Sequence, residues 1–487
     1  MPCTTILVGK KASYDGSTLI ARNDDGPFEP KKLIVVTPDK QPKKYQSKIG
    51  HLKIELPENP LRYSSTPTVQ GEHGVWPANG INEANVAMTA TETITSNPRV
   101  LGADPYVRYV KAKKRKEKDT IGGIGEEDLV LLVLPYVKTA REGVLRLGSL
   151  LEKYGTYEAN GIAFSDAEEC WWLETIGGHH WIARRVNDEE YVIMPNQFGM
   201  DRFDFADAFG EQKENLCSAD LREFVKDNHL DCSLNGVFNP RLAFGSHSDQ
   251  DHVYNTPRAW YIGRYFNPRT FKWDGPDAQF TPESDDIPWS LKPEKKITVE
   301  EIKYILSSYY QGTPYNPYQK ADVPQKGIYR PIGVANTDVM EVLQIRGYMP
   351  KELQGIEWLC FGGNTFNTCI PLYSFVSKFP KYVSETPKVV SSEYFYWASR
   401  LIGPLVDAHF GTAIQIVERY QEFVPAKGYE LLKEYDKKVL DSKDSKLLEE
   451  ANEKICKMAK EKADGVLGLV LKNAGEHSKN RYSRSDN

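Results

Sequence analysis

The pattern of apolar and polar residues at the start of the chain predicts a pair of antiparallel strands. Residues 3–8 form an apolar run rich in β-branched side chains, which is typical of a buried strand. Residues 9–16 supply turn residues and end in an Asp-Gly pair, which is a strong hairpin signal. Residues 17–21 then resemble a second strand, which we expect to end in the polar segment 22–26.

Longer periodicities predict how the rest of the chain is built. Residues 126–154 repeat apolar positions every three or four residues and predict a helix, as do residues 298–310 and 393–420. Residues 160–194 change to a period of two, which predicts four antiparallel strands. The tail from residue 429 to 463 resembles one or two amphipathic surface helices. Antiparallel strands on both sides of helices indicate an α+β sandwich rather than a doubly wound parallel sheet.

The chain of 487 residues shows no internal repeat and no long low-complexity linker. The simplest division is therefore one domain over residues 3–487, whose residues 385–475 form a mainly helical C-terminal portion.

Composition and charge exclude several classes of protein. The chain is 40% hydrophobic and 26% charged with a net charge of −5, which is ordinary for a globular protein. No basic stripe alternates with aromatic residues, so we expect no nucleic-acid partner. The apolar runs are far shorter than a membrane span, and no signal-peptide pattern precedes residue 3. The cysteine count of seven is odd, and no Cys-x-x-Cys occurs, which favours a reduced, cytoplasmic chain.

Metal and cofactor sites have no support in the sequence. His179, His180, His247 and His252 lack the spacing of ligands on one helix face. No Gly-x-Ser-x-Gly elbow is present, and the loop at residues 362–365 lacks the ending of a phosphate loop. The residues therefore favour neither a metal site nor a phosphate-binding loop.

The predicted hairpin places chemically useful groups together. If its strands pair, Arg22 and Asp25 return toward Cys3, so that a thiol, a guanidinium and a carboxylate share one site. A thiol becomes a nucleophile when a base takes its proton or its pKa falls. If Met1 and Pro2 were removed, Cys3 would carry its own base, a free α-amino group with a pKa of about 7.7–8.0. The competing interpretation is a buried cysteine beside a structural Arg–Asp pair.

These motifs resemble the N-terminal-nucleophile hydrolases, and in particular the bacterial dipeptidase A family of cysteine peptidases. Bile-acid and penicillin-V acylases share the wider pattern. The resemblance implies a four-layer αββα fold with helical C-terminal additions, cleavage of dipeptides with broad side-chain tolerance, and no cofactor. The matching fragments are Cys3-Thr4-Thr5, Asp15-Gly16-Ser17, Arg22-Asn23-x-Asp25, Pro195-Asn196 and Tyr254-Asn255-Thr256-Pro257-Arg258.

The resemblance also implies roles for two distant residues. The side-chain amide of Asn196 would donate to the oxyanion, and losing one such donor costs roughly 2.7–4 kcal/mol of transition-state stabilisation. The alternative is that Asn196 caps a turn after Pro195. Arg258 would lie beside the nucleophile, favour its thiolate and hold Asp25 ionised. The alternative for Arg258 is a structural pairing or stacking role.

The sequence does not identify the second oxyanion donor. In the acylase relatives, a Gly-Leu-Asn-Glu turn leads into a strand that supplies it. The corresponding region here offers Thr91, Glu92 and Thr93 in place of an amide side chain.

We expect a mature chain that begins at Cys3 after loss of a short propeptide, residues 1–2, and that forms a homo-oligomer. Two other hypotheses remain open: an amidase that cleaves larger acyl amides, and a non-catalytic binding protein like some secernins. The presence of all five candidate residues weighs against the second. These residues are Cys3, Arg22, Asp25, Asn196 and Arg258.

Overall fold

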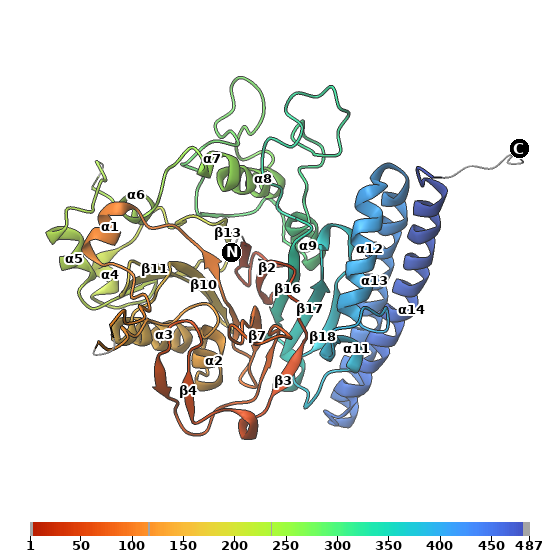
Figure 1. The fold of residues 1–487 in the computed structure, drawn as a ribbon, viewed down its shortest axis with the longest axis horizontal. Coiled ribbons are helices and arrows are strands. Elements are labelled where there is room, and N and C mark those ends of the chain that lie inside the picture. Colours follow the sequence, from red (N-terminus) through yellow and green to blue (C-terminus); the bar gives the residue numbers. More distant parts are fainter. Residues whose placement is uncertain (1–2, 115–116, 235, 481–487) are drawn as a thin grey trace, which may run out of the picture.

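A computed structural model describes residues 3–480 except 115–116 and 235, and the proposed propeptide, residues 1–2, lies outside these described residues. A seven-stranded antiparallel sheet contains the beginning of the chain, in the order β15-β13-β1-β2-β16-β17-β18 (Figure 1). Its strands are β1 (Thr4–Val8), β2 (Thr18–Asp25), β13 (Tyr191–Met194), β15 (Ser290–Leu291), β16 (Thr337–Ile345), β17 (Gly355–Phe361) and β18 (Ile370–Tyr373).

The predicted hairpin is confirmed, because β1 pairs antiparallel with β2 and Thr5 lies opposite Arg22. The segment that was expected to end the second strand is itself part of β2, which continues to Asp25. This extension follows from pairing on the other side, where Asp25 lies opposite Thr337 of β16.

A second antiparallel sheet has the order β14-β12-β11-β10-β8-β7, and β9 pairs with β10. Only three of the four strands predicted in residues 160–194 belong to it. The fourth, β13, crosses to the first sheet and pairs with β1, because its side chains are buried on both faces and suit a central strand. The strands of the second sheet are β7 (Asn79–Ile81), β8 (Ala87–Thr89), β9 (Glu92–Thr93), β10 (Asn160–Ser165), β11 (Cys170–Ile176), β12 (His180–Val186) and β14 (Asn215–Cys217).

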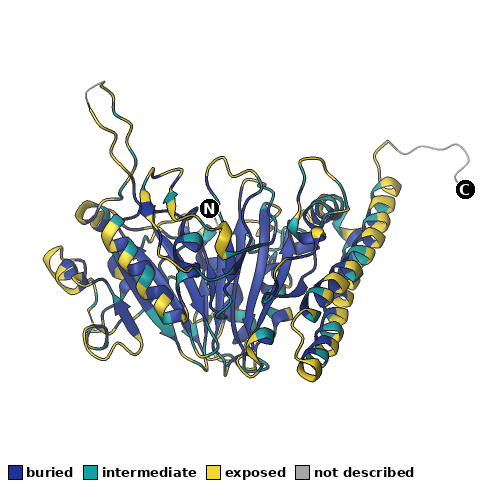
Figure 2. Ribbon diagram, turned by 90° about the horizontal axis from the view of Figure 1, so that it is seen from below, coloured by how far each residue is buried: buried dark blue, intermediate teal, exposed yellow. Residues whose placement is uncertain are grey.

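Apolar side chains form three separate clusters, which follow the packing of the sheets. One cluster joins the two sheets face to face and includes Leu7, Ile20 and Trp172. Another packs α2 and α3 on the outer face of the second sheet, and the largest packs helices on the outer face of the first. Buried strands therefore occupy the middle of the molecule, whereas the helices expose their outward faces (Figure 2).

The helix predicted over residues 126–154 is interrupted. It divides into α2 (Leu129–Val133), the 3-10 turn η2 (Leu134–Tyr136) and α3 (Ala140–Tyr154). Pro135 causes the break because it has no N–H for a helical hydrogen bond. Gly155 ends α3 with a φ of 68°, a conformation that glycine adopts readily.

Three helices fill most of the C-terminal portion and lie alongside β17 and β18 (Figure 1). They are α12 (Phe395–Ala408), α13 (Phe410–Ser442) and α14 (Leu447–Glu476). Within the part of the chain that the structure describes, no helix is both long enough and apolar enough to cross a membrane.

The remaining elements are short. Two small sheets pair β3 (Ile34–Val36) with β6 (Tyr63–Ser65), and β4 (Lys44–Gln46) with β5 (Lys53–Glu55). The other helices are η1 (Pro38–Lys40), α1 (Pro98–Ala103), α4 (Phe205–Ala208), α5 (Leu221–Asp227), α6 (Pro240–Phe244), α7 (Asp251–Tyr254), α8 (Thr256–Phe266), α9 (Val299–Leu306), α10 (Lys351–Gln354), η3 (Asn364–Phe366) and α11 (Lys381–Ser384).

Candidate active site

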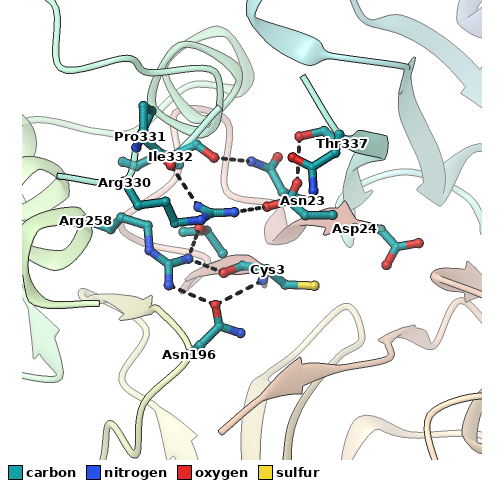
Figure 3. A network of polar contacts seen from close by, with 12 residues as sticks. Cys3, Asn23, Asp24, Asn196, Arg258, Arg330, Pro331, Ile332 and Thr337 are labelled. Atoms are coloured by element: carbon teal, nitrogen blue, oxygen red, sulfur yellow. Dashed lines mark hydrogen bonds and ion pairs between the residues drawn. The ribbon is translucent and has the colours of Figure 1, made fainter. Parts of the chain in front are cut away.

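Cys3 lies immediately before β1 and is completely buried. Its sulfur accepts a hydrogen bond of 2.9 Å from Nη2 of Arg22, which the neighbouring strand β2 carries. Its backbone nitrogen donates to Oδ1 of Asn196 over 3.1 Å. Figure 3 shows the sulfur pointing away from Arg258 and Asn196, so the side chain and the backbone of Cys3 contact different groups.

The guanidinium of Arg22 is surrounded by acceptors. Nη2 lies 3.0 Å from a carboxylate oxygen of Asp24 and 2.8 Å from Oε1 of Glu126. Nη1 donates to the carbonyls of Ala90 (2.6 Å) and Ala78 (3.3 Å). The carboxylates next to the thiol–guanidinium pair are therefore Asp24 and Glu126, whereas the sequence pattern had suggested Asp25.

Asp25 points to the opposite face of β2 from Asp24, because side chains alternate along a strand. Its carboxylate accepts from Arg330 (2.5 Å) and from the hydroxyl of Thr337 (2.6 Å). Burial raises the pKa of Asp25, and Arg330 opposes that rise more than Arg258 does. The direct cationic partner of Asp25 is therefore Arg330, and not Arg258 as the sequence suggested.

Arg258 is held at the beginning of α8 and is completely buried. Its guanidinium donates to the carbonyl oxygen of Cys3, to Oγ1 of Thr4 (2.8 Å) and to the side-chain oxygens of Asn196 (2.8 Å) and Asn255 (2.7 Å). Burial lowers the pKa of Arg258 to about 10. Arg258 therefore fixes the backbone of Cys3 at its carbonyl group, on the side away from the sulfur (Figure 3).

Asn196 reaches Cys3 because β13, which ends two residues earlier, pairs with β1. Its Oδ1 accepts from the Cys3 nitrogen and from Arg258, whereas its Nδ2 donates to the carbonyl of Thr93 over 2.9 Å. The Asn196 amide thus links Cys3 to β9, the strand in which the sequence did not identify an oxyanion donor.

Glu92 is the residue of that strand that enters the site. Its Oε2 accepts from the hydroxyl of Thr5 over 2.8 Å, and its buried Oε1 has no hydrogen-bond partner among the described residues. Burial raises the pKa of Glu92 to about 8, against the opposing effects of Arg258 and Arg22. Sequence reasoning placed Glu92 near the site without a role.

The burial of Cys3 favours the neutral form of its thiol. Burial raises its pKa well above the ordinary value, and the positive charge of Arg22 opposes this only in part. A base that accepts the thiol proton is therefore necessary before the sulfur can attack.

Glu126 and Arg330 also reach the site, although no sequence motif around either residue predicted this. Glu126 precedes the interrupted helix and Arg330 lies in a loop, so only the packing of distant segments brings them to the site. Among the residues that the structure describes, no three His, Cys, Asp or Glu side chains are grouped so as to hold a metal ion.

A cavity of about 460 Å³ opens beside Asn196. Thr93, Asp251 and Tyr254 are among the residues that line it. Its size lies within the range of small-molecule sites. The Asp251 carboxylate already accepts hydrogen bonds from Ser246 (2.9 Å) and from Asn255 (2.6 Å), so the cavity has an ordered polar wall next to the buried cysteine.

Comparison with known proteins places this site in a family. The sequence profile described as "Peptidase family C69" matches residues 2–423. The chain is 56% identical over 445 residues to a protein named "Dipeptidase" from Bifidobacterium longum (strain NCC 2705), covering 90% of this chain and 83% of that one. It is 47% identical over 491 residues to "Probable dipeptidase A" from Streptococcus pyogenes serotype M3 (strain SSI-1), covering 100% of each.

A third relative, "Probable dipeptidase B" from Lactococcus lactis subsp. lactis (strain IL1403), is 44% identical over 441 residues, which cover 89% of this chain and 87% of that protein. The profile covers most of the chain and includes every residue of the site around Cys3. The chain therefore belongs to peptidase family C69, a family of cysteine peptidases.

Proposed function

We propose that this protein is a dipeptidase that uses Cys3 as its nucleophile. The observation that carries the proposal is the convergence of Arg22, Asn196 and Arg258 on Cys3 from three separate segments of the chain. The names of the similar proteins add support, because one is named "Dipeptidase" and the other two are named as probable dipeptidases. Broad tolerance of substrate side chains is part of the proposal.

The proposal includes an N-terminal-nucleophile fold with four αββα layers and a single domain over residues 3–487. Two antiparallel sheets that pack face to face, with helices against their outer faces, support it. The shared cluster between the first sheet and α12–α14 supports one domain rather than two.

In the proposed maturation, the residues in front of Cys3 are removed, and its nitrogen becomes a free amine. That amine takes the thiol proton, the sulfur attacks the peptide carbonyl, and the amine protonates the departing amino acid. Water then hydrolyses the thioester with the same amine as base. The nitrogen of Cys3 already lies 3.1 Å from Oδ1 of Asn196, which would hold the amine in place.

The neighbouring residues would tune this chemistry. The Arg22 guanidinium, 2.9 Å from the sulfur, favours the thiolate against the effect of burial. Arg258 orients the backbone of Cys3, and Asp25 holds Arg330, whose positive charge acts on Arg258. For Asn196 to donate to the oxyanion, its Nδ2 would exchange the carbonyl of Thr93 for the substrate oxygen.

Intact-mass measurement of the purified, active enzyme tests this proposal together with the variant Cys3→Ala. We expect a chain that begins at Cys3, and a folded Cys3→Ala variant that neither loses the leading residues nor cleaves dipeptides. Cys232→Ala is the matched control, because that thiol is exposed and should leave turnover unchanged. An active chain that keeps Met1-Pro2, or an active Cys3→Ala variant, would contradict the mechanism.

A panel of dipeptides, tripeptides and larger acyl amides distinguishes the proposed activity from that of an amidase. Cytoplasmic location and a homo-oligomer remain predictions. All seven cysteines, each within the described residues, are unpaired, as suits a reducing compartment. Cell fractionation and light scattering would test these two predictions.

A further inference from the structure

A second and larger cavity, of about 660 Å³, lies between α9 and α13 over the first sheet. It is on the opposite face of that sheet from the thiol. Arg22 points toward Cys3, and the next residue, Asn23, points the other way and donates to the Leu306 carbonyl over 2.7 Å. Asn364 donates to Asn23 over 2.9 Å, and the same Asn364 accepts a hydrogen bond from the cavity side.

The floor of this cavity carries a cation and a hydroxyl that are incompletely satisfied. Lys303 donates to the carbonyl of Asn364 over 3.0 Å, and no described carboxylate lies within ion-pair distance of it. Burial lowers the pKa of Lys303. Thr368 is fully buried, and its hydroxyl has no hydrogen-bond partner among the described residues. Such groups cost free energy until a partner satisfies them, and a carboxylate would satisfy both.

The wall formed by α13 carries acidic side chains and hydrogen-bond acceptors, whereas the floor carries a cation. Glu418, Gln421, Glu422 and Pro425 follow the spacing of one helix face and line the cavity. Glu418 and Glu422 are exposed and form no ion pair within the described part of the chain. Pro425 has no N–H, so the Gln421 carbonyl lacks its usual helical hydrogen bond. This wall therefore offers acceptors for an ammonium group.

Aromatic side chains also line the cavity, from β17, α13, α9 and the loop after α9. Trp358 and Tyr429 lie with their rings 4.8 Å apart, and Tyr304 and Tyr309 contribute from α9 and the loop after it. Aromatic faces of this kind bury an apolar or aromatic body favourably and attract nearby cations.

We propose that this cavity binds a small zwitterion, namely a free α-amino acid or dipeptide with an aromatic or large apolar side chain. Its carboxylate meets Lys303 and Thr368, its ammonium meets Glu418 and Glu422, and its side chain packs against the aromatic residues. The volume lies within the 300–1,000 Å³ that is typical of small-molecule sites. The site is separate from Cys3 and does not depend on the chemistry proposed there.

Isothermal titration calorimetry on the full-length Cys3→Ala protein tests the proposal with three probes: L-phenylalanine, 3-phenylpropionate without the ammonium, and phenethylamine without the carboxylate. We expect Lys303→Met to weaken L-phenylalanine binding about tenfold or more, because a charge-assisted contact is lost. Lys427→Met is the matched control, since that exposed lysine pairs with Glu430 and does not line the cavity. The Lys427→Met protein should bind L-phenylalanine as tightly as the parent Cys3→Ala protein does.

The double variant Glu418→Gln/Glu422→Gln changes only exposed side chains and separates the two ends of the ligand. It should weaken L-phenylalanine and phenethylamine while leaving 3-phenylpropionate unchanged. Near-UV circular dichroism checks that Lys303→Met stays folded. Absence of L-phenylalanine binding, or equal binding by parent and both cavity variants, would overturn the proposal. So would binding that Asn196→Ala removes and Lys303→Met leaves intact, because the ligand would then occupy the site at Cys3.

Discussion

At the scale of single residues, burial has the largest effect on the site. It raises the pKa of the Cys3 thiol and of Glu92, and it lowers the pKa of Arg258. For the thiol, the opposing charge lies within hydrogen-bond distance, because Arg22 donates to the Cys3 sulfur. Burial therefore favours the neutral form of the Cys3 thiol and of the Glu92 carboxyl, and the effect matters most for Glu92, because an exposed carboxyl would be ionised at neutral pH.

The raised pKa of Glu92 predicts a pH-dependent cost to stability. The pKa is about 8 in the folded chain, against an ordinary value of 4.5, so the unfolded chain loses this proton first as the pH rises. A tenfold difference in proton affinity corresponds to about 1.4 kcal/mol, so the folded state loses several kcal/mol between these two values. We expect the free energy of unfolding of Glu92→Gln to rise relative to that of the parent as the pH increases from about 4.5 to about 8. Above about pH 8 the difference should stay constant.

Urea unfolding at about pH 5 and about pH 9 measures this difference. The control is Glu55→Gln, because that side chain is 80% exposed and should show no comparable change with pH. A difference between Glu92→Gln and its parent that is constant with pH would contradict the assignment.

At the scale of elements, neighbouring strands decide which side chains meet. β2 continues to Asp25 because β16 pairs with it, and the alternation of its side chains separates Asp24 from Asp25. On the other face of the same sheet, α9 begins with a capping box in which Thr298 and Glu301 exchange hydrogen bonds of 3.2 and 3.1 Å.

Thr298→Ala should weaken the beginning of α9. Loss of such a cap costs about 0.5–2 kcal/mol. Local opening should then speed amide exchange in the first turns of α9 by about fivefold for each kcal/mol. Hydrogen-exchange mass spectrometry measures this rate, and Ser149→Ala on the exposed face of α3 is the control. Unchanged exchange in α9 would show that packing alone fixes its first turn.

At the scale of the whole molecule, the C-terminal helices share one apolar cluster with the first sheet. Leu432 of α13 is 4% exposed and belongs to that cluster, whereas Leu440 of the same helix is 48% exposed. If the chain is one domain, damage to this helical layer must destabilise the sheet as well.

We expect Leu432→Ala to cost about 2–5 kcal/mol, as buried leucine truncations do, and Leu440→Ala to cost about 0.5 kcal/mol or less. Tryptophan fluorescence and far-UV circular dichroism should follow a single urea transition in both variants. Helices that unfold at lower urea than the tryptophans of the sheet would indicate two domains.

The sequence by itself determined the elements with strong local periodicity. The first hairpin and the strands of residues 160–186 are formed where the pattern predicted them, because their burial pattern is set by spacing along the chain. Helices also form in the C-terminal portion, but their ends differ from the predicted segments 393–420 and 429–463, since α13 continues from Phe410 to Ser442. It also located Cys3, Arg22, Asn196 and Arg258, whose hydrogen bonds join them in the structure. The periodicity did not predict the break at Pro135, although the missing N–H of that residue causes it.

Only the tertiary structure decided which carboxylates accompany the thiol. Glu126 is 104 residues from Arg22, and Arg330 is 305 residues from Asp25, so no local pattern links them. The choice between Asp24 and Asp25 depended on the pairing of β2 with β16, which is a long-range contact. Side-chain contacts between distant segments follow from how sheets and helices pack, and a pattern along one segment carries no information about the partner that the fold brings to it.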